Sequence, residues 1–99
     1  MKILALETEM TGATAEQFQQ HVRAEALQAW QLYQRDVIRE LYFRADQSTA
    51  VLILECESMD AARSTLDTLP LVQAGLIDFE IIPLKPYPGF SRLFEPVST

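Results

Sequence analysis

The sequence predicts one α+β domain in which four strands and two helices follow the order β-α-β-β-α-β. Three observations support this class. From Ala15 onward, apolar residues recur at spacings of three and four, which is typical of an amphipathic helix. Four shorter segments carry the branched and aromatic residues that strands favour. A short polar turn joins the second segment to the third, as in a hairpin. A chain of 99 residues with 48% hydrophobic content can build one core.

The first half of the chain supplies a strand and then a long helix. Lys2 to Glu7 is a short apolar run with charged ends, which suits a central strand. Thr14 is the expected N-cap of the first helix, and Gln17 completes a capping box. We expect this helix to run from Ala15 to about Gln34, with an apolar stripe formed by Ala15, Phe18, Val22, Ala26, Ala29, Trp30 and Tyr33.

A hairpin follows, with strands at Val37–Arg44 and Thr49–Glu55 around the turn "ADQS". The later strand is apolar almost throughout and is expected in the middle of the sheet, whereas its partner is expected at an edge. The register depends on the length of the turn. A five-residue turn places Arg39 opposite Glu55, and a four-residue turn places Ile38 there instead.

The second half of the chain supplies a helix and the last strand. Ser58 can cap a helix that runs to about Leu69, which Pro70 ends, and Gly75 closes a further short turn. Residues 78–84 form the fourth strand. Pro83 has no N–H, so this end of the strand cannot be paired on both sides.

This order is the ferredoxin-like plan, in which the helices cover one face of an antiparallel sheet. The other face would stay partly apolar through residues such as Ile3 and Ala5 or Val51 and Ile53. A second copy of the chain is the natural cover, so we expect a homodimer or a larger homo-oligomer. Residues 1–99 are taken as one domain, with 85–99 as a C-terminal arm that reaches the partner through Tyr87, Phe90, Leu93 and Phe94.

Composition excludes several function classes. The net charge is −6 and the basic residues are scattered, which disfavours nucleic acid as a partner. Cys56 is the single cysteine and His21 the single histidine, so we expect neither a zinc cluster nor a disulfide within the chain. No segment is typical of a secretion signal or of a membrane span, so we expect a cytoplasmic protein without membrane contact.

Charged side chains on the second strand are candidates for a binding site. Strict alternation places Arg39 on the more apolar face with Val37, Leu41 and Phe43, where its guanidinium needs Glu55 or an anionic ligand as partner. The opposite face carries Glu40, Tyr42 and Arg44 as edge or dimer contacts, although Tyr42 could also donate a proton.

Other candidates lie on the first helix and at the end of the third strand. His21 is the one side chain whose ordinary pKa lies near neutrality, and the alternative is a solvated histidine beside Glu25. Trp30 and Tyr33 offer flat surfaces to a ring or else fill the core. Glu55 and Glu57 could include a general base with a raised pKa or form salt bridges.

The segments "RELYFRA" and "LDTLPLVQAGLIDFEIIPLKPYP" resemble muconolactone isomerase and its relatives in the dimeric α/β-barrel superfamily. The resemblance covers roughly two-thirds of the chain by pattern. It implies a dimer or a larger ring, with a small cavity between sheet and helices for a cyclic, aromatic or lactone ligand. His21, Trp30, Tyr33 and the aromatic tail depart from the isomerase pattern.

These observations predict a protein that binds, and could isomerise, a small cyclic carboxylate or lactone without metal or organic cofactor. Lactone isomerisation needs a base, an acid and a cation for the substrate carboxylate. We predict His21 or Glu55 for the proton and Arg39 for the carboxylate. Further predicted substrate contacts are Trp30, Tyr33, Tyr42 and Arg44. The alternatives are a cofactor-free monooxygenase of the same superfamily and a non-enzymatic binding or assembly module.

Overall fold

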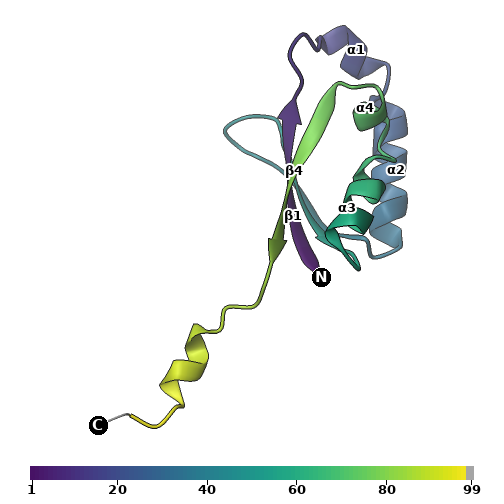
Figure 1. The fold of residues 1–99 in the computed structure, drawn as a ribbon. Helices are drawn as coiled ribbons and strands as arrows, with labels where there is room; N and C mark the ends of the chain where they lie inside the picture. Colours follow the sequence, from purple (N-terminus) through teal and green to yellow (C-terminus); the bar gives the residue numbers. More distant parts are fainter. Residues whose placement is uncertain (98–99) are drawn as a thin grey trace.

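The computed structural model describes residues 1–97 and has a single four-stranded sheet with helices on one face (Figure 1). The predicted α+β ferredoxin-like plan is confirmed. In chain order the elements are β1 (Lys2–Glu9), α1 (Ala15–Gln19), α2 (Val22–Gln34), β2 (Ile38–Phe43), β3 (Ala50–Glu55), α3 (Met59–Leu66), α4 (Pro70–Gln73), β4 (Ile77–Leu84) and the 3₁₀ helix η1 (Gly89–Leu93).

The strands lie in the order β2-β3-β1-β4, and all neighbours are antiparallel. β1 and β3 are therefore central and β2 is an edge, as predicted. β4 forms the other edge and pairs only with β1, so Pro83 removes no hydrogen bond from a second neighbour. None of the helices in the described part of the chain is both long and apolar enough to cross a membrane.

The single helix predicted over 15–34 is instead two helices. The capping box at the start of α1 is present, because Gln17 N donates to Thr14 Oγ1 and Thr14 N donates to Gln17 Oε1. The helix ends early because His21 N donates to Phe18 O at 2.9 Å, an i to i+3 bond that tightens the chain. His21, with a φ of −119°, is the N-cap of α2 and makes no side-chain capping hydrogen bond.

The second predicted helix is also divided. Ser58 caps α3 by accepting a hydrogen bond from Ala61 N, as predicted, but α3 ends at Leu66. Pro70 does not simply end a helix; it begins α4, where its missing N–H is not needed and its fixed φ suits the first turn. Gly75, with a φ of +73°, follows α4 and leads into β4.

A β-bulge at Arg39 overturns the predicted alternation on β2. Near the turn, Phe43 pairs with Ala50 and Glu40 with Ile53, but beyond the bulge Ile38 pairs with Leu54. The extra residue brings Ile38 onto the same face as Leu41 and Phe43, where it is only 1% exposed. Arg39 loses a strand partner, so neither predicted pairing of Glu55, with Arg39 or with Ile38, occurs.

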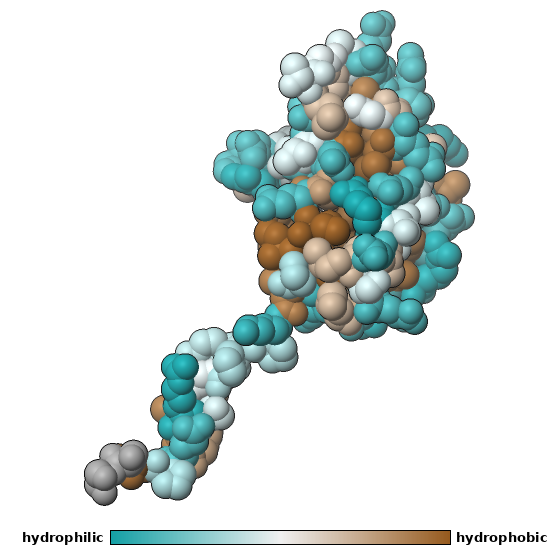
Figure 2. Space-filling model, viewed as in Figure 1, coloured by the Kyte–Doolittle hydropathy of each residue, from teal (hydrophilic) through white to brown (hydrophobic). Residues whose placement is uncertain are grey.

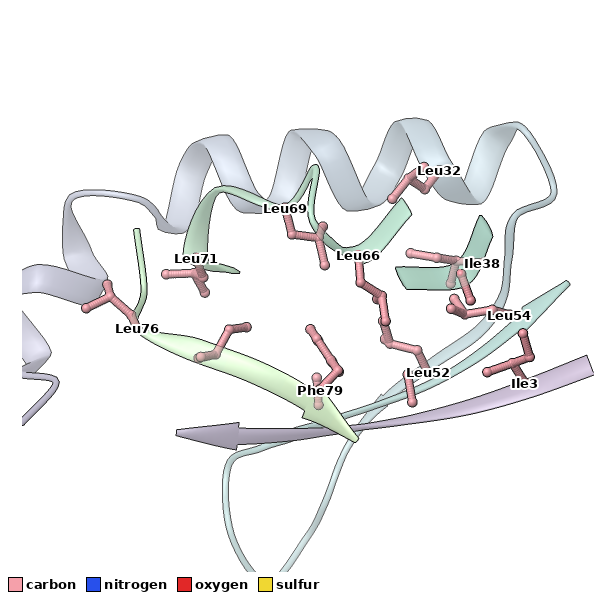
Figure 3. Close-up of a cluster of buried hydrophobic side chains, with 14 residues drawn as sticks. Ile3, Leu32, Ile38, Leu52, Leu54, Leu66, Leu69, Leu71, Leu76 and Phe79 are labelled. Atoms are coloured by element: carbon pink, nitrogen blue, oxygen red, sulfur yellow. The ribbon is translucent and has the colours of Figure 1, made fainter. Parts of the chain in front are cut away.

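The core lies between the sheet and the helices (Figure 3). The leucines Leu32, Leu66, Leu69 and Leu71 come down from the helical layer and meet apolar side chains of all four strands. The buried apolar side chains of the strands are Ile3, Ala5, Ile38, Ala50, Leu52, Leu54, Ile77 and Phe79.

On the uncovered face of the sheet, the β1 residues are not the predicted Ile3 and Ala5. Ile3 and Ala5 are fully buried under the helices, so they do not belong to the open face. Val51 and Ile53 do lie there, and Leu4 and Leu6 pair with them across the sheet. All four are half-buried. Figure 2 shows hydrophobic atoms gathered over the sheet at the level of β1 and β4.

Residues 85–97 leave the end of β4 and project away from the body of the molecule (Figure 1). The long axis of the chain is consequently 65 Å, against 29 and 21 Å in the other directions. Within this segment the Tyr87 and Phe90 rings meet edge to face at 5.1 Å, and Gly89 is buried beneath Tyr87. The last two residues of the predicted arm, 98 and 99, lie outside the described residues.

Asp36 follows α2 with a φ of +62°, a left-handed conformation that glycine adopts without strain. We expect Asp36→Gly to raise the free energy of unfolding by about 0.5 kcal/mol. This is the net effect, because the relief of the left-handed strain exceeds the entropy that glycine adds to the unfolded chain. Urea unfolding measures this change. Ala74→Gly is the control, because Ala74 ends α4 at a φ of −77° and glycine there should lower stability. A loss of stability in both variants contradicts the interpretation.

Candidate functional site

A cavity of about 400 Å³ lies between α2, α4 and the helix-facing side of the sheet. Its walls are almost entirely apolar, and among residues 1–97 two glutamates are the only charged residues that line it. The volume suits a single substituted ring. The lining residues are Glu7, Val22, Glu25, Ala26, Ala29, Ile38, Leu41, Phe43, Ala50, Leu52, Leu69, Leu71 and Phe79.

The two glutamates reach the cavity from opposite layers. Glu7 follows Ile3 and Ala5 on the helix-facing side of β1, and its Oε1 accepts a hydrogen bond from Ala50 N at 3.2 Å. Glu25 lies on α2, and its Oε1 accepts from Leu71 N at 2.9 Å. Each carboxyl group is thus held by one backbone N–H through one oxygen. Within residues 1–97, no hydrogen bond to the other oxygen of either group is formed.

Both carboxyl groups have raised pKa values. Burial raises the pKa of Glu7 above its ordinary value of 4.5, and the charges of Glu9 and Glu25 add to this, while the hydrogen bond from Ala50 opposes it. Burial likewise raises the pKa of Glu25, against the hydrogen bond from Leu71 and the nearby His21. A carboxylate with a raised pKa is a stronger proton acceptor, and its acid form persists closer to neutral pH.

The chemistry of this lining restricts the ligand. No basic side chain of the described residues lines the cavity, so a carboxylate placed inside would face two glutamates without a cation. An uncharged ring with hydroxyl or polarised C–H groups suits the walls and can share protons with both carboxyl groups. Nowhere in residues 1–97 do three or more His, Cys, Asp or Glu side chains gather in a way that could hold a metal ion.

Four of the predicted substrate contacts gather in a second hollow at the α2–β2 edge. This groove, of about 620 Å³, is lined by Trp30, Tyr33, Arg39 and Tyr42 together with Ala26, Ala29, Glu40 and Leu41. Ala26, Ala29 and Leu41 also line the cavity, so the two hollows adjoin.

The aromatic and charged side chains of this groove are partly engaged. The Trp30 and Tyr33 rings stack at 5.8 Å and are about half exposed, so they do not fill the core. Arg39 Nε donates to Asp36 O at 2.7 Å, and Tyr42 donates its hydroxyl proton to Glu40 Oε1 at 2.8 Å. That bond raises the pKa of Tyr42, because it favours the protonated phenol.

The other predicted site residues lie elsewhere. His21 is half-buried at the N-cap of α2, beside Glu25, and does not line the cavity. Glu55 accepts from the N-terminal ammonium group at 3.1 Å and lines a third hollow with Cys56. Arg44 makes a two-bond ion pair with Asp46 in the turn after β2. The structure therefore does not bring the predicted acid–base residues and the predicted ligand contacts into one site.

Sequence reasoning missed Glu7 and Glu25 as site residues. A usable signal was present for Glu7, since it continues the alternation of Ile3 and Ala5 onto the buried face of β1. Glu25 was considered only as a surface neighbour of His21. Glu25 lies three residues after Val22 and four before Ala29, so the same apolar spacing places it on the inward face of α2.

No protein-family profile matches the chain, and no curated protein matches it. Among solved structures, the chain is similar to 5-chloro-2-hydroxyhydroquinone dehydrochlorinase (TftG) from Burkholderia phenoliruptrix AC1100, in complex with 2,5-dihydroxybenzoquinone. The TM-score is 0.67 at 20% sequence identity, over 86% of this chain and 94% of that chain. This likeness supports the ferredoxin-like α+β fold.

The raised pKa of Glu7 makes stability depend on pH in a defined direction. The folded chain holds the Glu7 proton more tightly than the unfolded chain, so the wild type loses stability as the pH rises from 4.5 through the folded pKa. Glu7→Gln keeps an acceptor for Ala50 N but carries no charge. We therefore expect the variant to be more stable than wild type at about pH 7 and equal to it at about pH 3.5.

Urea unfolding at both pH values measures this difference. Glu57→Gln, on an exposed loop, is the matched control and should change stability little at either pH. A stability gap between Glu7→Gln and wild type that is the same at both pH values contradicts the assignment.

Proposed function

We propose that this protein binds a small cyclic molecule in the cavity and moves a proton on it, in the manner of an isomerase or a lyase. The proposal rests on one observation: two glutamates with raised pKa values line an apolar cavity from opposite layers, and the cavity has room for a ring. Pairs of carboxyl groups in dry sites commonly divide the roles of base and acid.

In the proposed reaction, one glutamate removes a proton from a carbon beside a carbonyl group and the other returns a proton elsewhere on the ring. The electron pair left on the ring moves through the conjugated system, so a double bond shifts without net oxidation. Each carboxyl group is fixed by one backbone N–H through Oε1, which leaves Oε2 to exchange the proton. The apolar walls cover most of the ring and so favour transfer of the proton between the ring and the glutamates rather than to water.

The substrate class follows from the walls and from the resemblances. The solved structure of similar fold holds a dihydroxylated quinone, and muconolactone isomerase acts on a lactone; both ligands are small oxygenated rings. We propose a lactone or a hydroxylated ring for this chain, with muconolactone-like isomerisation as the specific reaction. A carboxylate on the substrate belongs at Arg39 in the adjoining groove, because the glutamates of the cavity repel it.

The remaining predicted residues take supporting roles in this proposal. His21 lies next to Glu25, and the charge of His21 lowers the pKa of that carboxyl group. Trp30, Tyr33 and Tyr42 border the groove that leads to the cavity. We assign the proton-transfer role predicted for Glu55 to Glu7, because Glu55 lies outside the cavity and lines a different hollow. Arg44 is engaged by Asp46 and is left without a substrate role.

We also propose that the chain forms a homodimer in the cytoplasm. The open face of the sheet supports the dimer, because its apolar side chains are only half covered by their own neighbours. Pairing two such faces buries them from water without disturbing the helical layer.

Hydrogen–deuterium exchange at the ring carbons tests the proposed chemistry. A panel of five- and six-membered lactones and hydroquinones is incubated with the protein in D₂O and followed by proton NMR. For a ligand that exchanges, we expect Glu7→Gln and Glu25→Gln each to slow exchange by about 10²- to 10⁴-fold, because each removes a proton carrier. Glu57→Gln is the control. Exchange at the wild-type rate in both variants contradicts the proposal.

Ligand affinity tests the separate role of Arg39. We expect Arg39→Ala to weaken binding of ring ligands that carry a carboxylate by on the order of tenfold, while ligands without one bind as before. Isothermal titration calorimetry gives both dissociation constants. Arg35→Ala, an exposed arginine outside the groove, is the matched control. An equal loss for both ligand types would place the carboxylate elsewhere.

Light scattering tests the dimer. Ile53→Lys puts a charge in the open sheet face, and we expect the molar mass to fall toward that of one chain because an unpaired charge there opposes burial. Met10→Lys, on an exposed residue beyond β1, should keep the wild-type mass. A dimer that survives Ile53→Lys must use another surface.

A further inference from the structure

The cavity has an unfinished rim at the α2–β2 edge. Val22, Leu41 and Phe43 line the cavity, yet they are 42%, 47% and 72% exposed. Trp30 and Tyr33 continue this exposed apolar surface along α2. A ligand in the cavity would be open to water on this side, where proton transfer needs water to be excluded.

The C-terminal segment has the complementary problem. Tyr87, Phe90, Leu93 and Phe94 are 68%, 68%, 75% and 84% exposed, on a segment that stands clear of the body (Figure 1). Side chains of this size are rarely left in water on a structured segment unless a partner covers them. Two apolar surfaces of one chain thus lack a cover, and one of them is shaped as a projecting arm.

Charge also divides between the two parts. Residues 85–99 carry Lys85 and Arg92 against Glu95, a net charge of +1, whereas residues 1–84 carry six basic and thirteen acidic residues, a net charge of −7. The two values sum to the −6 of the whole chain. A basic arm is attracted to the acidic body of another copy, which steers the two together before contact.

We infer that the arm of one chain seats across the α2–β2 edge of a second copy and closes the mouth of its cavity. The donor is a second copy because the arm leaves β4, at the sheet edge opposite β2, and is directed away from its own body (Figure 1). Pro86 and Pro88 restrict the backbone just where the arm would have to turn back.

The contact is made by side chains. The two prolines have no N–H to donate, so the start of the arm does not add a strand to β2. Its aromatic rings instead pack on Trp30, Tyr33 and the rim residues Leu41 and Phe43, in the stacked and edge-to-face arrangements that aromatic groups favour. The inference rests on the proposed function only for what the cavity binds; the docking of the arm stands independently of the reaction.

Trp30 is the only tryptophan of the chain and lies in the proposed seat, so its fluorescence reports docking without any ligand. The receptor is the full chain with Phe90→Ser and Phe94→Ser, which keeps Trp30 but loses the arm's rings. The donor is the full chain with Trp30→Phe, which keeps the arm and emits no tryptophan signal. We expect the receptor's emission to shift saturably to shorter wavelength as donor is added.

Two results would overturn the inference. The first is equal emission from wild type and receptor at every concentration, which means that no arm covers Trp30. The second is an emission shift in wild type that does not depend on concentration, together with no emission shift when donor is added to receptor. That result means that each arm folds onto its own chain. A donor that also carries Phe90→Ser and Phe94→Ser is the control and should leave the receptor's emission unchanged.

Ligand binding then tests whether the arm completes the cavity. For a ring ligand that binds wild type, we expect the Phe90→Ser/Phe94→Ser variant to bind on the order of tenfold more weakly, and added donor to restore the affinity. If fluorescence shows docking but no ring ligand binds wild type, the docking of the arm is supported and the proposed reaction is contradicted. A ligand that binds both chains equally well shows that the arm does not close the cavity.

Discussion

The bulge at Arg39 decides which side chains of β2 belong to the core and which belong to the site. Without the extra residue, Ile38 would face away from the helices and Arg39 would point into the apolar layer. With it, Ile38 fills the core, Leu41 and Phe43 line the cavity, and Arg39 turns to the groove beside Trp30. The separation of an apolar cavity from a charged groove therefore depends on one inserted position in one edge strand.

The glutamates serve the fold and the site at once. Glu25 accepts a hydrogen bond from Leu71 N, in the short helix α4, and so links α4 to α2 across the cavity. Glu7 makes the equivalent link from β1 to the start of β3. Each bond partly offsets the cost of burying a carboxyl group, and each fixes the position of the group that we assign to proton transfer. Stability and reactivity are consequently linked through the same two side chains.

The sequence was sufficient for the order of the elements, the capping residues Thr14 and Ser58 and the edge position of Pro83, because local patterns determine these features. It was insufficient for the cavity. The register of the hairpin depends on a bulge for which no residue of β2 is diagnostic. The spacing of Glu25 from Val22 and Ala29 places it on the apolar face of α2, but that spacing alone does not show that its carboxyl group is buried. The predicted ligand contacts Trp30, Tyr33, Arg39 and Tyr42 did assemble, since they flank one edge. His21 and Glu55, the two alternatives predicted for the proton, do not line the cavity, because burial of a proton carrier depends on packing.

The position of β1 has a consequence for how the chain is made. β1 lies between β3 and β4, and Lys2 pairs with Leu84. The first strand of the domain therefore gains its second neighbour only when the last strand is available. During translation the hairpin of β2 and β3 can form early and offer β3 to β1, while the far side of β1 stays open until Leu84 has left the ribosome. Final closure of the sheet is a contact between distant parts of the chain, and such contacts form slowly. Until β4 pairs, the nascent domain has one unpaired edge on its central strand β1, and this edge is what chaperones have to protect.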